Sequence, residues 1–348
     1  MTFHRRHLLQ GALTLGALQA FPGLSQAQAR KLVVATFQGS WEEAHRDAWV
    51  PAFRASAPGS DMVLDAILSV DQISKITAAR ANPPIDVMLM DPGPALVALG
   101  QDLAEPYPVA QSAHYKDLIT DAQEPMGPAN FIQCVGMIYN PEKVKSPPTS
   151  WADIWKPEYK GRVGITNLNS TLGTGFLVEI SRMRGGSEAN VDAGFKALEE
   201  LKPNLGAVAA NPGALATLYQ QEQVDIGPGN FNAIQILKSR GVPVEFAAPK
   251  EGAIGFKTTI HIVKNTPVKE LAFKLIEATL SPEVQTKLMD SPYLIIPTNS
   301  KVKMTGEIAK VLAKDTDEIK RKLVFQDWKT INQNRQAWIE RFNREIRV

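Results

Sequence analysis

The sequence contains a single cysteine, Cys134, among its 348 residues. One thiol cannot form an intramolecular disulfide, so the fold must be stabilised by packing even in an oxidising compartment. Cys134 lies within the apolar residues 131–138, a short run that is typical of a buried β-strand. We therefore interpret Cys134 as a packed strand residue and not as a nucleophile.

The sequence also lacks the motifs of common enzyme and metal sites. The histidines beyond residue 29, His45, His114 and His261, are spaced in no metal-binding pattern. We find no HExxH, GxSxG or GxxxxGK motif, and the glycine pairs at 173–175 and 227–229 lack the third glycine of a dinucleotide-binding loop. The sequence predicts a protein that is not an enzyme and holds no cofactor or metal. An exported enzyme remains the alternative of another class.

No apolar run is long enough to cross a membrane, but the N-terminus has the pattern of an export signal. Arg5 and Arg6 precede an acid-free apolar run over residues 8–24, which polar and glycine residues interrupt before the roughly 20 residues that a membrane span needs. Small residues at 27 and 29 predict cleavage after Ala29 and a periplasmic protein. The paired arginines resemble a twin-arginine signal, from which His4 and Gln10 depart. The alternative is a buried N-terminal helix or a membrane anchor.

The chain shows no excess of charge of either sign. Removal of residues 1–29 takes two arginines from the 38 basic residues and leaves 36 against 36 acidic ones. A neutral chain without basic runs gives no electrostatic reason to expect nucleic acid or anionic lipid as a partner.

Alternating strands and helices indicate an α/β fold. A strand over residues 31–37 precedes a helix for which Ser40 can act as the cap, and Pro58 and Gly59 end that helix. The same alternation follows with strands over 62–68 and 85–90 and helices over 71–81 and 93–99. This pattern predicts a mostly parallel sheet that helices cover on both faces.

A second α/β unit begins near Asn140, after which residues 146–150 form a rigid connection. Its expected strands cover 162–166, 224–227, 244–246 and 258–263, and its expected helices cover 215–221, 232–240 and a segment that Ser170 or Thr171 caps. The last third is predicted as helices over 268–280, from Pro282 with Ser281 as cap, and over 328–346.

Several segments in series resemble the extracellular solute-binding proteins of bacterial ABC importers, in the spermidine/putrescine-binding branch of the type II periplasmic binding proteins. The resemblance covers most of residues 31–300 and rests on residues 151–163, 249–254, 272–276, 281–285 and 291–299. It implies a monomeric receptor that captures a small organic solute between two lobes and delivers it to the membrane permease of an ABC importer. A receptor that also signals through a membrane partner remains open.

The resemblance further implies how the chain divides. Strands near 136–139 and 258–262 would cross between the lobes as a hinge. Lobe 1 would comprise residues 30–138 and 259–302, and lobe 2 residues 139–258 and 303–348.

Candidate ligand-binding residues in lobe 1 follow two predicted strands. Ser40 can donate a hydrogen bond, and Trp41 offers a flat face for stacking, with packing against its own helix as the alternative. Asp91 follows the strand over 85–90 and faces the same opening, unless it serves as a helix cap.

Candidates in lobe 2 include hydroxyl residues between a strand and a helix. Ser170, Thr171 and Thr174 suit an anionic group, with an ordinary helix cap as the alternative. The resemblance adds two pairs: Asn230 with Phe231, and Phe256 with Thr258.

The resemblance also bears on the charge of the solute. Polyamine binders of the family carry carboxylates in the segment that corresponds to 167–178, where this chain has none, and an aspartate where this chain has Thr258. Burial of an ammonium group without a carboxylate is expensive. A neutral or anionic solute, such as a carboxylate or phosphoryl compound, is therefore favoured over a polyamine, which stays the alternative. Iron(III) is disfavoured because Tyr293 has no neighbouring tyrosine.

Overall fold

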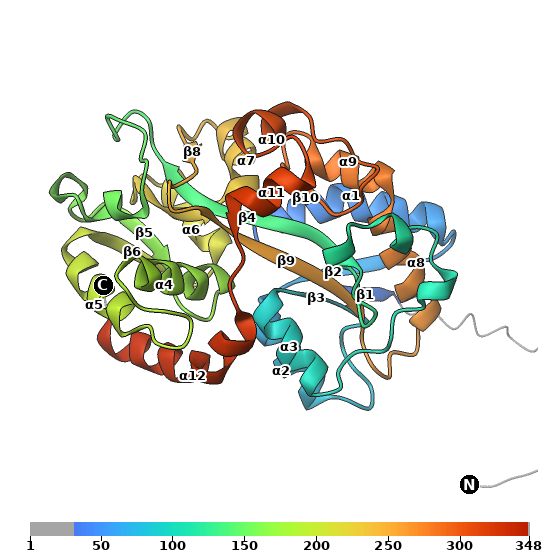
Figure 1. The fold of residues 1–348 in the computed structure, drawn as a ribbon. Helices are drawn as coiled ribbons and strands as arrows, with labels where there is room; N and C mark the ends of the chain where they lie inside the picture. Colours follow the sequence, from blue (N-terminus) through green and yellow to red (C-terminus); the bar gives the residue numbers. More distant parts are fainter. Residues whose placement is uncertain (1–30, 347–348) are drawn as a thin grey trace, which may run out of the picture. The chain divides into compact units, whose positions relative to one another are not determined.

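The computed structural model describes residues 31–346, so the predicted export signal and its cleavage site lie outside the described residues. The first part of the chain forms a parallel three-stranded unit in the order β2-β1-β3, which we call the first half-sheet. Its strands are β1 (Leu32–Thr36), β2 (Met62–Ala66) and β3 (Val87–Met90). The helices that connect or follow them are α1 (Ser40–Ser56), α2 (Ser69–Ala78) and α3 (Pro92–Gly100). The predicted alternation is confirmed here (Figure 1).

A second parallel unit, the second half-sheet, has the order β7-β5-β6. Its strands are β5 (Val163–Thr166), β6 (Leu205–Ala209) and β7 (Ile226–Asn230), and its helices are α4 (Thr171–Met183), α5 (Asp192–Leu201), α6 (Pro212–Gln220) and α7 (Ile234–Ser239). The sequence pattern missed α5 and β6. Short 3₁₀ helices cover Val109–Gln111, Tyr115–Asp117, Thr120–Ala122, Trp151–Trp155, Pro157–Tyr159, Lys202–Asn204 and Phe231–Ala233.

Two long antiparallel strands join the half-sheets. They are β4 (Ala129–Tyr139) and β9 (Ala253–Ile262), and they lie side by side between β3 and β7 (Figure 1). Short strands pair with them: β8 (Glu245–Ala247) and β10 (Ile296–Pro297) with β4, and β11 (Leu323–Val324) with β9. The crossing strands that the resemblance implied are therefore present, and both are longer than the sequence segments first assigned to them.

Strand direction brings the carboxyl ends of both half-sheets to one place. β3 ends at Met90, which pairs with Thr259 of β9, and β7 ends at Asn230, which pairs with Val135 of β4. Val135 in turn pairs with Ile254 of β9. The two carboxyl edges thus face each other across residues 254–259 of β9. Loops and helix N-termini that follow parallel strands gather at such edges, where open α/β sheets bind ligands.

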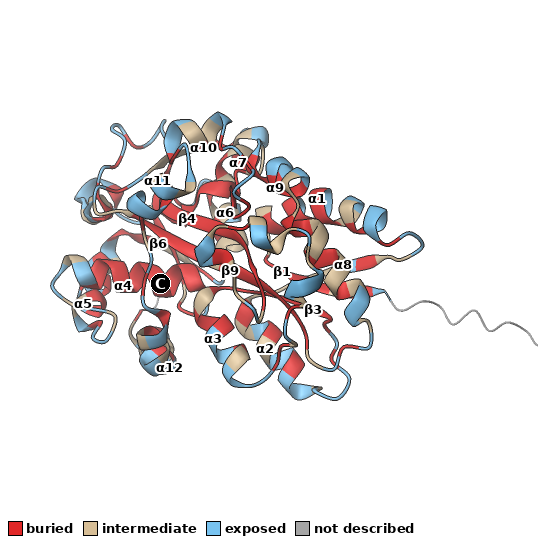
Figure 2. Cartoon of the chain, turned by 45° about the vertical axis from the view of Figure 1, so that its right-hand side comes forward, coloured by how far each residue is buried: buried red, intermediate tan, exposed pale blue. Residues whose placement is uncertain are grey.

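Separate apolar cores support the two half-sheets. The first is packed under α1, α8 (Lys269–Leu280) and α9 (Pro282–Met289), and the second under α4, α5 and α12 (Trp328–Glu345). A further cluster spans the central strands and includes Cys134, which is 4% exposed, as the sequence predicted. It extends to α10 (Gly306–Val311) and α11 (Thr316–Lys322). Figure 2 shows the central strands buried along their length.

Helix ends confirm one expected cap and correct another. Ser281 caps α9 by accepting a hydrogen bond from the Val284 N–H, with Pro282 at the first helical position. The expectation that Ser40 caps α1 is wrong, because Ser40 is the first helical residue and Gly39 is the N-cap. Gly39 has φ 74°, a left-handed conformation that glycine adopts without strain. Across residues 31–346, no helix has the length and apolar character required to traverse a membrane.

Candidate functional site

A buried carboxylate, Asp91, lies at the centre of the gap between the two carboxyl edges. Asp91 is the N-cap residue of α3, yet its side chain makes no cap hydrogen bond, so the helix-cap interpretation does not explain it. Its Oδ1 accepts a hydrogen bond of 2.6 Å from Gln133 Nε2 and lies 3.5 Å from Thr258 Oγ1. The Thr171 hydroxyl, from the second half-sheet, is also within hydrogen-bonding reach of this carboxylate. Asp91 therefore bridges both halves of the molecule.

Gln133 of β4 orders the polar groups around it. Its Nε2 donates to Asp91 and, at 2.8 Å, to Thr258 Oγ1, which leaves its Oε1 to accept from Asn230 Nδ2 at 3.1 Å. Because Asp91 accepts, the amide of Gln133 must point its nitrogen there, and Asn230 must then present its nitrogen to Gln133. The Oδ1 of Asn230 is consequently left buried and without a partner.

The N-terminus of α4 forms the opposite wall of the site. Ser170 is the N-cap residue and is 2% exposed, but its side chain makes no cap hydrogen bond, so the ordinary-cap interpretation fails here too. The first backbone bond of this end runs from the Thr174 N–H to Ser170 O, and the preceding N–H groups, of residues 171–173, have no hydrogen-bond partner among the described residues.

Arg335 of α12 holds this wall in place and adds positive charge. Its Nε donates to Thr174 Oγ1 at 3.1 Å, and its Nη2 donates to the carbonyl oxygens of Leu168 at 3.1 Å and Asn169 at 3.0 Å. The Thr174 hydroxyl itself donates to Leu168 O, so Thr174 shapes the loop instead of facing the gap.

Asp91 and Arg335 influence each other's ionisation. Burial lowers the pKa of Arg335 to about 10, and the charge of Asp91 opposes this shift, so the guanidinium remains protonated at neutral pH. Burial raises the pKa of Asp91 above its ordinary value, and the contacts with Thr171 and Gln133 and the charge of Arg335 oppose this shift only in part.

The loop after β1 closes the site from the other side. Ser40 Oγ accepts a hydrogen bond of 2.9 Å from Asn232 Nδ2, across the two half-sheets. A Cβ atom on Gly39 would lie 3.0 Å from Gly213 Cα, so the two backbones are in contact. The carbonyl oxygens of the Gln38 and Asn232 side chains are buried without partners, like that of Asn230.

A small cavity lies among these residues. It is lined by residues from both half-sheets, among them Gln38, Ser40, Leu172 and Asn230, and its free space of about 20 Å³ suits one water molecule. In this arrangement the halves are closed on each other, and a larger solute requires them to separate.

The predicted aromatic candidates pack elsewhere. Trp41 is 2% exposed and stacks on Phe131 with ring centroids 4.8 Å apart, inside the first core. The ring centroid of Phe231 lies 4.9 Å from that of Phe246, and the ring centroid of Phe256 lies 5.9 Å from that of Trp328. The structure thus brings together Ser40, Asp91, Ser170, Thr171, Asn230 and Thr258, whereas the aromatic side chains and Thr174 support them. Sequence reasoning missed Gln38, Gln133, Asn232 and Arg335.

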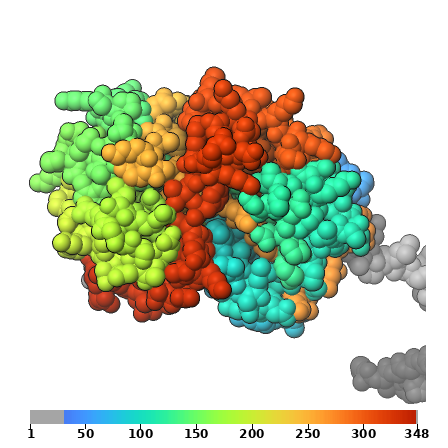
Figure 3. Space-filling view, in the orientation of Figure 1, coloured from blue at the N-terminus to red at the C-terminus, as the bar shows by residue number. Residues whose placement is uncertain are grey.

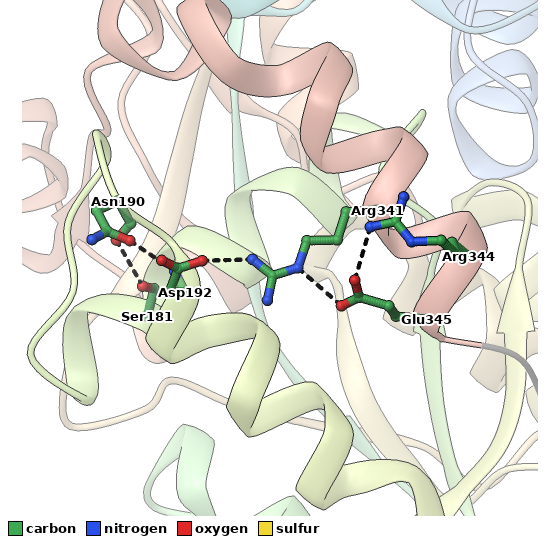
Figure 4. Close-up of polar contacts among 6 residues, drawn as sticks. All are labelled: Ser181, Asn190, Asp192, Arg341, Arg344 and Glu345. Carbon is green, nitrogen blue, oxygen red and sulfur yellow. Dashed lines mark hydrogen bonds and ion pairs between the residues drawn. The ribbon is translucent and has the colours of Figure 1, made fainter.

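Helix α12, which supplies Arg335, belongs to the second half of the molecule. Near its end Arg341 pairs with Asp192 at the start of α5 and with Glu345 (Figure 4). The guanidinium of Arg341 also lies 4.1 Å from the Phe195 ring centroid. Asn190, whose Oδ1 accepts from the Asp192 N–H, orders the same corner. Arg335 therefore moves with the second half-sheet.

A larger cavity of about 470 Å³ lies near the C-terminal segment over residues 325–328. In Figure 3 the surface is hollowed beside this red segment. The walls are largely apolar, and its lysines are already paired, Lys257 with Glu124 and Lys320 with Asp121. We favour the polar gap as the ligand site, because hydrogen-bonded polar side chains from both half-sheets converge there around Asp91 and Gln133.

Metal binding has no support in the described part of the chain. Among residues 31–346, no three His, Cys, Asp or Glu side chains are grouped so that they could hold a metal ion. His45 and His261 are buried in separate places, and Tyr293 has Asp47 as its polar neighbour.

The chain is similar in sequence to known solute-binding proteins. Residues 82–334 match the profile of the family described as bacterial extracellular solute-binding protein. The spermidine/putrescine-binding periplasmic protein of Escherichia coli K12 is 30% identical over 49% of this chain and 50% of its own length. The gamma-aminobutyric acid-binding protein of Pseudomonas aeruginosa PAO1 is 24% identical over 76% of each chain. The chain thus spans about half the length of the first curated relatives that it matches.

Solved structures share the fold. A periplasmic binding protein of Actinobacillus pleuropneumoniae, solved with fructose-6-phosphate, superposes with a TM-score of 0.74 at 21% identity over 91% of this chain and 98% of its own. At this identity the likeness shows the fold alone: the two-lobed α/β fold of the type II periplasmic binding proteins, as the sequence predicted. With the profile match over residues 82–334, the chain belongs to the bacterial extracellular solute-binding protein family.

Proposed function

We propose that this protein is a solute receptor that binds a small organic molecule in the gap between its two lobes and delivers it to an ABC importer. The observation that carries the proposal is the polar cluster of Asp91, Gln133, Thr258, Asn230 and Thr171, which joins both carboxyl edges at one buried point. Such convergent polar groups between two lobes are typical of ligand sites.

Reversible binding fits the cluster better than catalysis does. Its members are a carboxylate, amides and hydroxyls, and none of them is a histidine or a cysteine that could act as a base or nucleophile. We infer that the protein is not an enzyme. Closing of the lobes on the solute would give a permease a shape distinct from that of the empty receptor.

The proposal also includes the location of the protein, the cleavage position of its signal and the boundaries of its lobes. We infer a periplasmic, monomeric protein whose signal is cleaved after Ala29. Lobe 1 comprises residues 30–138 and 259–302, and lobe 2 residues 139–258 and 303–348; the separate cores under α1 and α4 support this division.

A thermal-shift screen of the protein lacking residues 1–29 against small metabolites tests the proposal. A solute at 100 times its Kd stabilises the folded state by about 2.7 kcal/mol, which raises the melting temperature by several degrees. Asn230→Ala should weaken binding at least tenfold, whereas Asn343→Ala, on the exposed face of α12, should not. The absence of any binding solute, or turnover of the solute by the protein, would contradict the proposal.

The alternative is a polyamine receptor, which the spermidine/putrescine-binding relatives favour. A large shift with spermidine and with no other compound would establish this alternative in place of a neutral or anionic solute.

A further inference from the structure

We propose that the solute is a compact zwitterion, whose cationic group pairs with Asp91 and whose anionic group binds at the N-terminus of α4. This inference rests on the proposed function and concerns the charge of the ligand at the same site. It starts from the arrangement of donors and acceptors, which are separated onto two sides of the gap.

One side of the gap contains acceptors. The side-chain oxygens of Asn230, Asn232 and Gln38 are buried without hydrogen-bond partners, and Gln38 and Asn230 line the interlobe cavity. Gln133 links the carboxylate of Asp91 to Asn230, because it donates to Asp91 and accepts from Asn230. Ammonium groups have three donors and no acceptor, so this set of oxygens matches a cation and offers nothing to a second anion.

The other side of the gap contains donors. It consists of the N–H groups of residues 171–173, the hydroxyls of Ser170 and Thr171, and the positive charge of Arg335 behind them. Anions are stabilised at helix N-termini by such N–H groups and by the helix dipole.

In the closed arrangement, Asp91 occupies the place of a ligand anion. Its carboxylate is within reach of the Thr171 hydroxyl and is attracted by the charge of Arg335. An incoming carboxylate or phosphonate must displace the Asp91 carboxylate, because two anions repel each other at the N-terminus of one helix. The displaced Asp91 then needs a cation, and the ligand's own ammonium group supplies it.

The charged side chains at the gap also favour a zwitterionic ligand. Asp91 contributes a carboxylate, which accepts a hydrogen bond from Gln133 Nε2, and Arg335 contributes a guanidinium, whereas the buried Glu179 lies 3.7 Å from Arg182. A polycation would leave Arg335 and the α4 terminus uncompensated, and an anion alone would leave Asp91 uncompensated. Uncompensated buried charge is costly, so a ligand with one charge of each sign fits best.

Isothermal titration calorimetry with probes of matched length tests the inference. The zwitterion 4-aminobutanoate has butylamine and butanoate as its single-charge counterparts, and the zwitterion 2-aminoethylphosphonate has ethylamine and ethylphosphonate. We expect at least one zwitterion to bind at least 100-fold more tightly than its counterparts. If the metabolite screen finds a ligand that binds more tightly than these probes, we expect that ligand to carry one charge of each sign as well.

The variant Asp91→Asn keeps the size and the acceptor oxygen but removes the charge. We expect the ratio of zwitterion to anion affinity to fall at least tenfold, with the melting temperature nearly unchanged, while Asp121→Asn at the other cavity leaves the ratio unaltered. Thr171→Val should weaken the binding of the zwitterion and of the anion alike.

Two results separate failure of this inference from failure of the proposed function. A tightly bound ligand that has charge of only one sign, or no charge, would contradict the zwitterion inference. So would an unchanged ratio of zwitterion to anion affinity in Asp91→Asn. Neither result would contradict the proposed receptor function. No binding by any solute would remove both.

Discussion

Trp41 follows Ser40 directly but points away from the gap. Its indole lies against Phe131 and near His45 and Phe37, in the core of lobe 1. The packing interpretation that the sequence left open agrees with this burial. Ser40, by contrast, keeps its side chain at the lobe interface through Asn232. Two adjacent residues thus have separate roles, one in stability and one at the site.

Trp41→Ala should therefore destabilise the fold. Loss of a large buried aromatic side chain costs about 3–5 kcal/mol, which urea denaturation would detect. Phe325→Ala, at a side chain that is 44% exposed, is the control and should lower the free energy of unfolding by much less than Trp41→Ala does. If Trp41→Ala kept its stability and lost solute binding, the stacking role would be restored.

At the scale of elements, the contact between α3 and α12 joins the lobes at one edge of the gap. Gly93, in the first turn of α3, packs against Trp328, and its carbonyl oxygen accepts a hydrogen bond of 2.7 Å from Asn332 Nδ2. A Cβ atom on Gly93 would lie 2.3 Å from Trp328 Cε3, too close for the closed arrangement.

Gly93→Ala should hold the lobes apart. We expect solute binding at least tenfold weaker, because the closed state is penalised, and a larger radius of gyration in X-ray scattering with solute present. Gly100→Ala is a matched control at the far end of the same helix, where an added Cβ meets nothing within 4 Å. Equal affinities in the two variants would show that this contact does not limit closure.

Much of this element order could be predicted from the sequence, because strand–helix alternation fixes which residues follow the strands. For that reason the sequence predicts Ser40, Asp91 and Thr171 at the ends of strands. Gln133 lies inside the apolar run over residues 131–138, and Arg335 lies in a helix far along the chain, so neither has a local signal. The strand β6 was missed because its glycine and alanines give weak strand preference.

The directions of side chains also could not be predicted from the sequence. Asp91 and Ser170 sit at helix N-caps, where the sequence suggests capping, but tertiary partners draw the Asp91 side chain across the gap. For the aromatic candidates, burial depends on segments distant in sequence, such as β4 beneath Trp41.

For the molecule as a whole, two buried histidines make the fold sensitive to mild acid. Burial lowers the pKa of His45 to about 3 and of His261 to about 4, from an ordinary value near 6.5. The folded chain keeps both neutral, while the unfolded chain binds a proton at each below pH 6.5. Their contribution is therefore fully present above pH 6.5 and is lost as the pH falls towards the folded values.

Between pH 7 and 5 we expect the free energy of unfolding to fall by about 3–4 kcal/mol, from about 1.4 kcal/mol per pH unit for each histidine. Urea denaturation across this range measures it. His45→Phe, which retains a ring to stack on Trp49, should reduce proton uptake on unfolding from about two to about one. An uptake that stays at two would rule out His45 as a source.

The lone sulfhydryl of this protein has a practical consequence. Cys134 is enclosed by the cluster around the central strands, so maleimide reagents have no access to it in the native state. A cysteine introduced at the exposed Phe325, on the segment beside the lobe junction, would then be the sole point of attachment for an environment-sensitive dye. The natural sequence thus already suits conversion into a fluorescent biosensor, with no native thiol to remove.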